Sequence, residues 1–125
     1  MNEMTDAKET VRKQLLQNAN LVTLLGGKRV YKRPAPDGKE FPRVTIFEVD
    51  QSDGDYADDK PMSDEVVSQI DEWNKKDTQA IFEEIDRIMK ENGWRRSGKQ
   101  EFYEQDTGVH HKALRYRDKF LKESD

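Results

Sequence analysis

The chain has 125 residues, of which 33% are hydrophobic and 38% are charged, and its formal net charge is −4. It holds no cysteine, which excludes disulfide bonds, a thiol nucleophile and cysteine-ligated zinc. No stretch approaches the roughly 20 apolar residues of a membrane helix, and the polar, acidic first residues are unlike a secretory signal. Length and sparse apolar content predict a single domain, 1–125, built as two layers and used inside a cell.

Two helices are predicted in the N-terminal part of the chain. The first follows a cap at Thr5 or Asp6 and runs to about Gln17. Its apolar stripe is spaced by four residues and consists of Ala7, Val11 and Leu15. Asn20 is predicted to cap a shorter second helix. The pair Gly26–Gly27 ends that helix, because glycine accepts the left-handed conformation of a helix stop.

Three strands are predicted next. Arg29–Tyr31 is a short one, and Arg43–Val49 is the clearest because it is β-branched and aromatic. Between them, 34–38 contains two prolines and a glycine and predicts a turn. Gln51–Ser63 is acidic and nearly free of apolar side chains, so we expect a long, mobile loop. The third strand is Glu65–Trp73.

The main helix is predicted to start at Asp77 or Thr78 and to stop at Asn92–Gly93. Its stripe has the helical spacing that packs against a sheet and consists of Ala80, Ile81, Ile85, Ile88 and Met89. Among its polar residues, no paired carboxylates sit in an apolar surround of the kind that acid–base catalysis requires. The same holds for Asp71 and Glu72, which we place on alternate faces of a strand.

The last predicted elements form a hairpin of Trp94–Glu104 and Val109–Arg117. The polar tail 118–125 is expected to fray. A hairpin at the end and a strand pair in the middle favour an antiparallel arrangement. The predicted fold is therefore α+β, an antiparallel sheet of about four to five strands with helices packed mainly on one face.

Charge is unevenly distributed along the chain. The range 48–77 has 11 acidic and 3 basic residues, a net charge of −8, whereas 93–122 has 8 basic and 4 acidic residues, a net charge of +4. Opposed potentials on separate segments orient docking between copies. The candidate assembly surface consists of Arg95, Arg96, Arg115, Arg117, Asp53, Asp55, Asp58 and Asp59.

Other chemistry finds little support in the sequence. His110 and His111 are adjacent on a strand, so they point to opposite faces and do not readily chelate one metal. An EF-hand frame starting at Asp53 fails at three positions, Ala57, Asp58 and Asp64. The stretch 26–29 lacks the first glycine and the hydroxyl of a phosphate loop. We therefore predict no catalytic, cofactor or metal site.

The order of helix stops, turns and strands along the chain resembles that of phage tail-completion (tail-terminator) proteins. The resemblance lies in 21–31, where a short helix ends in glycine before a strand ending in tyrosine, in 35–38 followed by Phe41–Ile46, and in Ser68–Trp73. It extends from about Val11 to Arg117. It implies a non-enzymatic structural protein without cofactor, made in the bacterial host cytoplasm and carried in the virion tail. Its implied partners are its own copies in a hexameric ring, the tail tube and the head connector, with no membrane and no sequence-specific nucleic acid.

Two alternatives remain open. One is a nucleic-acid-associated accessory protein that binds phosphates through Arg95, Arg96, Lys99, Arg115 and Arg117. The other is a small, monomeric regulatory binding module. Salt-dependent DNA binding favours the first, and the oligomeric state separates the second from a ring protein.

Overall fold

The computed structural model describes residues 7–32, 38–49 and 63–121, with positions 63–65 and 118–121 described by their backbone only. The elements follow the predicted order. They are α1 (Ala7–Leu16), α2 (Ala19–Leu25), β1 (Val30–Tyr31), β2 (Arg43–Val49), β3 (Ser63–Asn74), α3 (Gln79–Glu91), β4 (Arg95–Glu104) and β5 (Val109–Leu121).

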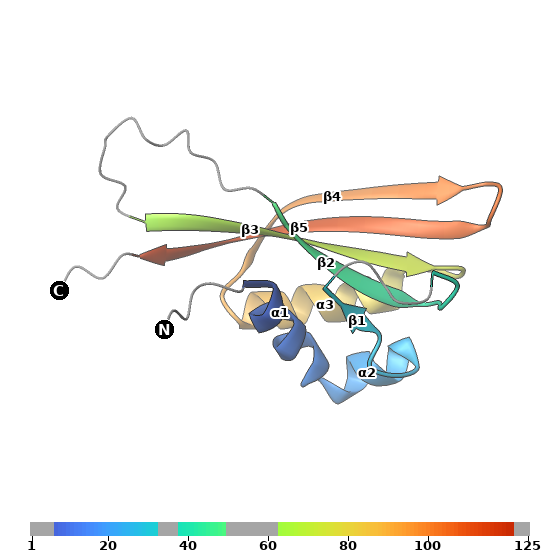
Figure 1. Cartoon of the computed structure of the whole chain (residues 1–125), viewed down its shortest axis with the longest axis horizontal. Coiled ribbons are helices and arrows are strands. Elements are labelled where there is room, and N and C mark those ends of the chain that lie inside the picture. The colour runs from blue at the N-terminus through green and yellow to red at the C-terminus, as the bar shows by residue number, and fades with distance from the viewer. Residues whose placement is uncertain (1–6, 33–37, 50–62, 122–125) are drawn as a thin grey trace.

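The strands form one five-stranded sheet in the order β1-β2-β3-β5-β4, and the helices cover one of its faces (Figure 1). This confirms the α+β prediction. All pairs are antiparallel except β1 with β2, which is parallel, so the sheet is mixed. Because β1 and β2 are parallel, β2 must start at the same end of the sheet as β1. The connection between them is longer than a tight hairpin turn, which joins only antiparallel strands.

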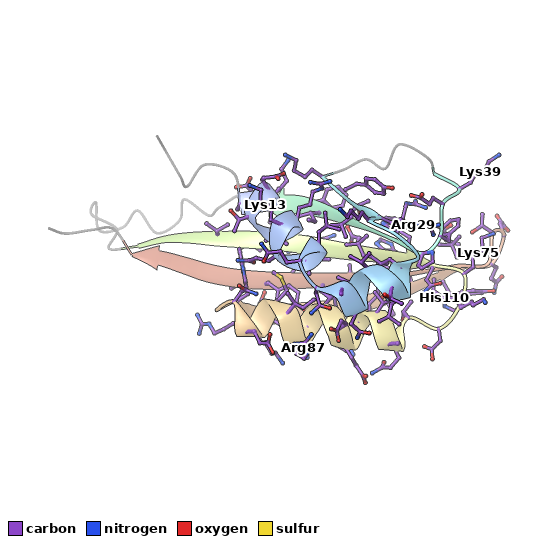
Figure 2. All side chains as sticks on the ribbon, turned by 90° about the horizontal axis from the view of Figure 1, so that it is seen from below. Lys13, Arg29, Lys39, Lys75, Arg87 and His110 are labelled. Carbon is purple, nitrogen blue, oxygen red and sulfur yellow. The ribbon has the colours of Figure 1, made fainter. Side chains whose placement is uncertain are left out.

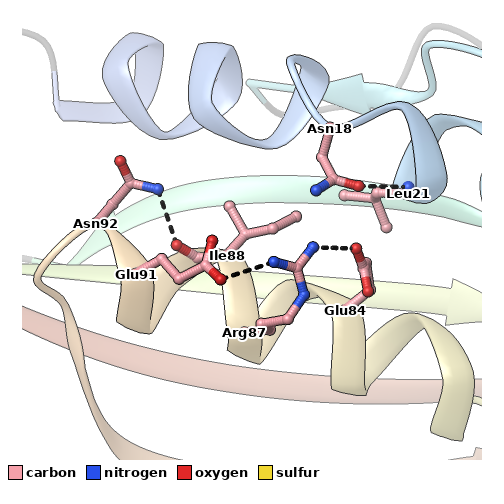
Figure 3. Close-up of polar contacts among 7 residues, drawn as sticks. All are labelled: Asn18, Leu21, Glu84, Arg87, Ile88, Glu91 and Asn92. Carbon is pink, nitrogen blue, oxygen red and sulfur yellow. Dashed lines mark hydrogen bonds and ion pairs between the residues drawn. The ribbon is translucent and has the colours of Figure 1, made fainter.

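The first helix packs by its predicted apolar stripe, which confirms that prediction. Ala7, Val11 and Leu15 of α1 are buried in the core. The cap of α2 is Asn18 rather than the predicted Asn20: Asn18 Oδ1 accepts a hydrogen bond from the Leu21 backbone N–H at 2.9 Å (Figure 3). The helix stops at Gly26, whose φ of 81° lies in the left-handed region that glycine tolerates.

Helix α3 packs beneath the β5–β4 side of the sheet, where Asp86 contacts Tyr116 of β5 and Arg96 of β4. The predicted Ile81, Ile85, Ile88 and Met89 are buried, but Ala80 is exposed and Phe82 takes its place in the core. The outer side carries a charged cluster in which Arg87 pairs with both Glu84 and Glu91 (Figures 2 and 3).

The two long strands of the sheet exceed their predicted bounds. Strand β5 continues to Leu121 instead of ending at Arg117, because Ser63–Val66 of β3 offers it a partner along that length. Ser63 thus belongs to β3, and the rest of the predicted loop lies outside the described residues, as does the end of the tail, 122–125. At the other end of the sheet, the β4–β5 hairpin turns at Gln105–Gly108 and projects beyond the helices (Figure 1).

Candidate assembly face

The register gives the sheet two different faces. Ile46, Ile70 and Leu114 lie side by side and join the core beneath the helices. Because side chains alternate along a strand, the neighbouring row Thr45, Asp71 and Ala113 faces the opposite way. We call this second side the open face, since none of the described helices covers it (Figure 1).

A hydrogen-bonded network lies flat on the open face. The Asp71 carboxylate is fully buried, accepts a hydrogen bond from Gln69 Nε2 at 3.0 Å and lies 3.1 Å from His111 Nε2. Arg115 Nε donates to Gln69 Oε1 at 3.0 Å, and Trp73 Nε1 donates to Thr45 Oγ1 at 3.0 Å. The network holds polar side chains of three adjacent strands in one fixed layer.

Aromatic rings extend this layer toward the hairpin turn. The Trp73 and His111 rings stack with centroids 3.8 Å apart, and the Phe102 centroid lies 5.3 Å from that of His111. On the other side of the hairpin, Tyr103 lies 4.7 Å from His110. Phe102 and Tyr103 are 49% and 56% exposed. Exposed rings held in place are typical anchors of protein interfaces.

The two histidines point to opposite faces, as predicted. His110 contacts Tyr103 at the hairpin end of the molecule (Figure 2), whereas His111 belongs to the open-face network. Across the part of the chain that the structure describes, no three histidine, aspartate or glutamate side chains gather as a metal site would require.

The four arginines of the candidate assembly surface lie on two different faces of the sheet. Arg96 lies on the helix side, where its Nε is 3.2 Å from Asp86 Oδ1 and its Cζ is 5.3 Å from the Phe82 ring centroid. Arg95, Arg115 and Arg117 lie on the open face by register. Sequence alternation alone did not separate them, because a β-bulge between Arg96 and Gly98 shifts the pairing.

A shallow groove of about 520 Å³ runs over β4 and β5 on the open face. It is lined by Gln69, Ser97, Gly98, Lys99, Gln100, Phe102, His111, Ala113 and Arg115. The set contains cationic, amide and aromatic groups and no carboxylate. The predicted partners of this basic surface, Asp53, Asp55, Asp58 and Asp59, lie outside the described residues.

Charged side chains on the helix side of the sheet form ion pairs with one another. Asp86 of α3 accepts a hydrogen bond from the Tyr116 hydroxyl at 2.8 Å, and it also pairs with Lys90 and Arg96. Burial acts to raise the pKa of the Asp86 carboxyl, but these three neighbours together lower that pKa below its usual value. Burial, followed by the Asp86 carboxylate, raises the pKa of Tyr116. The hydroxyl therefore stays protonated and ties β5 to α3.

The sequence-based interpretation of Asp71 and Glu72 was wrong, because both carboxyls are fully buried in the central strand. Burial raises the pKa of Glu72 to about 8, against the opposing effects of the Asn74 hydrogen bond and the Lys112 charge. Glu72 Oε1 has no hydrogen-bond partner among the described residues. Nearby Lys112 is only 1% exposed and pairs with Glu101 at 3.0 Å. Since Glu72 does not reach the surface, its perturbed pKa is a property of the core.

The fold is of the α+β class, and its open face presents polar and aromatic groups that none of the described helices covers. The sequence matches the family described as tail completion protein gp17 over residues 9–118. The chain belongs to this family, and its role is a structural one in phage tail assembly.

One solved structure illustrates the fold in a virion. A chain of the structure titled "Virion of native gene transfer agent (GTA) particle" matches with a TM-score of 0.67 and 14% identity, over 93% of this chain and 95% of that chain. At this identity the likeness concerns the fold. No curated protein matches the sequence at a significant level. Within the described ranges, no helix has the length and apolar character needed to cross a membrane.

Proposed function

We propose that the protein completes the head-proximal end of a phage tail as a hexameric ring of its own copies and joins the tail tube to the head connector. It would do so without catalysis, in the cytoplasm of the bacterial host. The observation that carries the proposal is the family match over residues 9–118. The open face and the sheet edge supply the surfaces that assembly needs.

The sheet edge formed by β4 supports self-association. Strand β4 is ten residues long and pairs only with β5 among the described strands, so its other edge is available. Exposed edges invite pairing with another chain, and charged side chains and bulges restrain it. Arg95, Arg96 and the bulge before Gly98 provide such restraint at one end, while Phe102 and Tyr103 lie near the other. We therefore expect weak self-association in solution and stable rings on a finished tail tube.

Two titratable groups among the described residues are consistent with a non-catalytic role. Glu72, the carboxyl with the most raised pKa, is enclosed in the core. His111 is stacked on Trp73 and faces the buried Asp71 carboxylate. Neither arrangement combines a perturbed group with an accessible site, which acid–base catalysis needs.

A complementation experiment tests the proposal. Deleting the gene from the phage is expected to yield separate heads and tails by negative-stain electron microscopy, and added purified protein should restore joined particles. Rings at the head-proximal tail end should carry the protein, as labelled by antibody. Joined, infectious particles in the absence of the protein would overturn the proposed role.

A further inference from the structure

We propose that two copies of the chain pair in solution through the outer edge of β4, antiparallel to each other and centred on Gln100. Strand β4 is the last strand in the order β1-β2-β3-β5-β4, so no described strand of the same chain covers its outer edge (Figure 1). The contact is isologous, unlike the heterologous contacts of the proposed ring, and it does not depend on that ring. Three properties of β4 support it: the order of its charges, the faces on which they lie and the exposure of its side chains.

The charges of β4 and the following turn are antisymmetric about Gln100. Residues 95–99 include three cations and no acidic residue, whereas 101–106 include three acidic residues and no cation. Two copies of the strand placed side by side in parallel bring like charges together. Antiparallel copies centred on Gln100 instead bring each cationic half beside an acidic half, and opposite charges across a strand pair are stabilising. The strand is therefore complementary to an inverted copy of itself.

The faces on which the charges lie agree with this register. Lys99 and Glu101 lie on the helix side of the sheet, opposite Leu114 and Lys112 of β5. A two-fold axis at Gln100 keeps each face on its own side, because directly opposite residues of antiparallel strands point the same way. Lys99 of each copy therefore meets Glu101 of the other, and the ion pair forms twice. Centring the contact on Lys99 or on Glu101 would set like charges directly opposite each other.

On the open face, the same register places an aromatic ring across from a glycine. Gly98, Gln100 and Phe102 all lie on this face, and Phe102 comes opposite Gly98 of the second copy. The Phe102 ring is 49% exposed, and a Cβ added at Gly98 would meet only Arg115 Cβ, at 3.9 Å. An aromatic ring across from an edge glycine covers the backbone that the glycine leaves bare. The dimer would therefore cover both exposed Phe102 rings.

The edge has groups left for a partner, over a short length. All of β4 except Gly98 is exposed. Glu101 Oε2 pairs with Lys112 Nζ at 3.0 Å, and the second oxygen of that carboxylate can accept from Lys99 of the other copy. The bulge between Arg96 and Gly98 interrupts the regular strand, so the contact is small and the dimer weak. Because an isologous contact uses both edges at once, pairing stops at two copies.

Charge exchange on β4 tests the partner and the register together. Lys99→Glu sets carboxylates opposite each other at both ion pairs, and Glu101→Lys sets ammonium groups opposite each other. Each variant alone should self-associate more weakly than wild type, by on the order of tenfold or more, in a sedimentation-velocity concentration series. An equimolar mixture of the two should dimerise like wild type, because every pair then joins opposite charges. Lys13→Glu makes the same change at an exposed position of α1 and should leave dimerisation unaltered.

Disulfide trapping provides a second test that leaves Lys99 and Glu101 in place, since the chain has no cysteine of its own. Gln100→Cys places both thiols at the two-fold axis, where opposite Cα atoms lie about 4.5–5.5 Å apart, within the reach of a disulfide. The oxidised variant should run as a dimer on a non-reducing gel. Glu104→Cys is the matched control, exposed on the same face of the same strand. Its two copies would lie about eight positions apart, or roughly 26 Å, and should stay monomeric.

Several outcomes would overturn the dimer. They are a monomeric wild type throughout the concentration series, equal disulfide yields for Gln100→Cys and Glu104→Cys, and a mixture of the two charge variants that stays monomeric although both fold. Self-association that Lys99→Glu leaves unchanged would assign the contact to another surface. Thermal midpoints report whether Glu101→Lys, which takes the ion-pair partner from buried Lys112, still folds, and the cysteine pair decides if it does not. Neither test needs head-to-tail joining, so the dimer and the proposed function fail separately.

Discussion

The two faces of the same sheet use buried side chains in different ways. The helix side combines Ile46, Ile70 and Leu114 with the stripe of α3, and its ion pairs neutralise local charges. The open face buries Asp71 under a layer of amide, imidazole and indole groups and leaves arginines exposed. One face thus packs against the helices and stabilises the protomer, while the other leaves aromatic and cationic side chains exposed, which the proposed assembly would use.

The largest change in unfolding free energy is expected when a core side chain on the helix side of the sheet is truncated. Replacing Ile85, which is fully buried, with Ala should cost about 2–5 kcal/mol of unfolding free energy, because it leaves a cavity between α3 and the sheet. Denaturant unfolding measures the loss. Phe102→Ala on the open face should cost no more than about 1 kcal/mol, since its ring is half exposed. Equal losses of unfolding free energy in the two variants would show that the two faces do not differ in their contribution to stability.

The next effect depends on pH and concerns Glu72. Its folded-state pKa of about 8 lies above the ordinary 4.5, so both states hold the proton at low pH. As the pH rises from 4.5 to 8, only the unfolded state ionises, and folding stability falls by at most roughly 1.4 kcal/mol per unit before levelling off. Glu72→Gln removes this loss, so the variant should gain stability relative to wild type by roughly 3 kcal/mol between about pH 5 and pH 8. Parallel stability curves for the two proteins would contradict the prediction.

A smaller effect is expected in the open-face network. Asp71→Ala leaves Gln69 Nε2 and His111 without their shared acceptor and should cost about 1–3 kcal/mol. Chemical denaturation gives the size, and tryptophan fluorescence reports the loosening of the Trp73–His111 stack. Asp106→Ala, in the exposed hairpin turn, is the matched control and should change stability little. A loss below about half a kilocalorie would show that the network does not order the face.

The smallest change in stability is expected at the N-terminal cap of α2, which lies on neither face of the sheet. Asn18→Ala removes the cap of α2 and should cost about 1 kcal/mol, as judged by thermal melting. Asn20→Ala should cost less, because the α2 cap bond is made by Asn18. A larger loss of stability for Asn20→Ala than for Asn18→Ala would instead support Asn20, the residue predicted from the sequence, as the cap. Both variants should join heads to tails normally, which separates stability from assembly.

The elements themselves were predictable because their signals are local. The strand Arg43–Val49 is confirmed at both ends, and the glycine stop at Gly26 and the buried positions Ile81 and Ile85 are confirmed as well. Such signals depend on backbone preference and side-chain spacing within one segment.

The faces were not predictable, because they depend on register between distant segments. Asp71 and Glu72 look like surface residues in the sequence, and only their position in a strand with a neighbour on each side buries them. The bulge after Arg96 fixes which arginines share a face, and Gly98 is its only local hint. The parallel pairing of β1 likewise follows from the path of the chain rather than from its two residues.

The central position of β3 also sets an order in time. Its neighbours come from opposite directions along the chain, and Gln69 lies 46 positions before its partner Arg115. Contacts between such distant positions form late, because closing a long loop costs conformational entropy before any contact compensates for it. The open-face network needs β5 beside β3, so a chain still emerging from the ribosome lacks this face. If the proposed ring uses this face, a protomer would be able to join it only after its sheet is complete, and unfinished chains would be excluded.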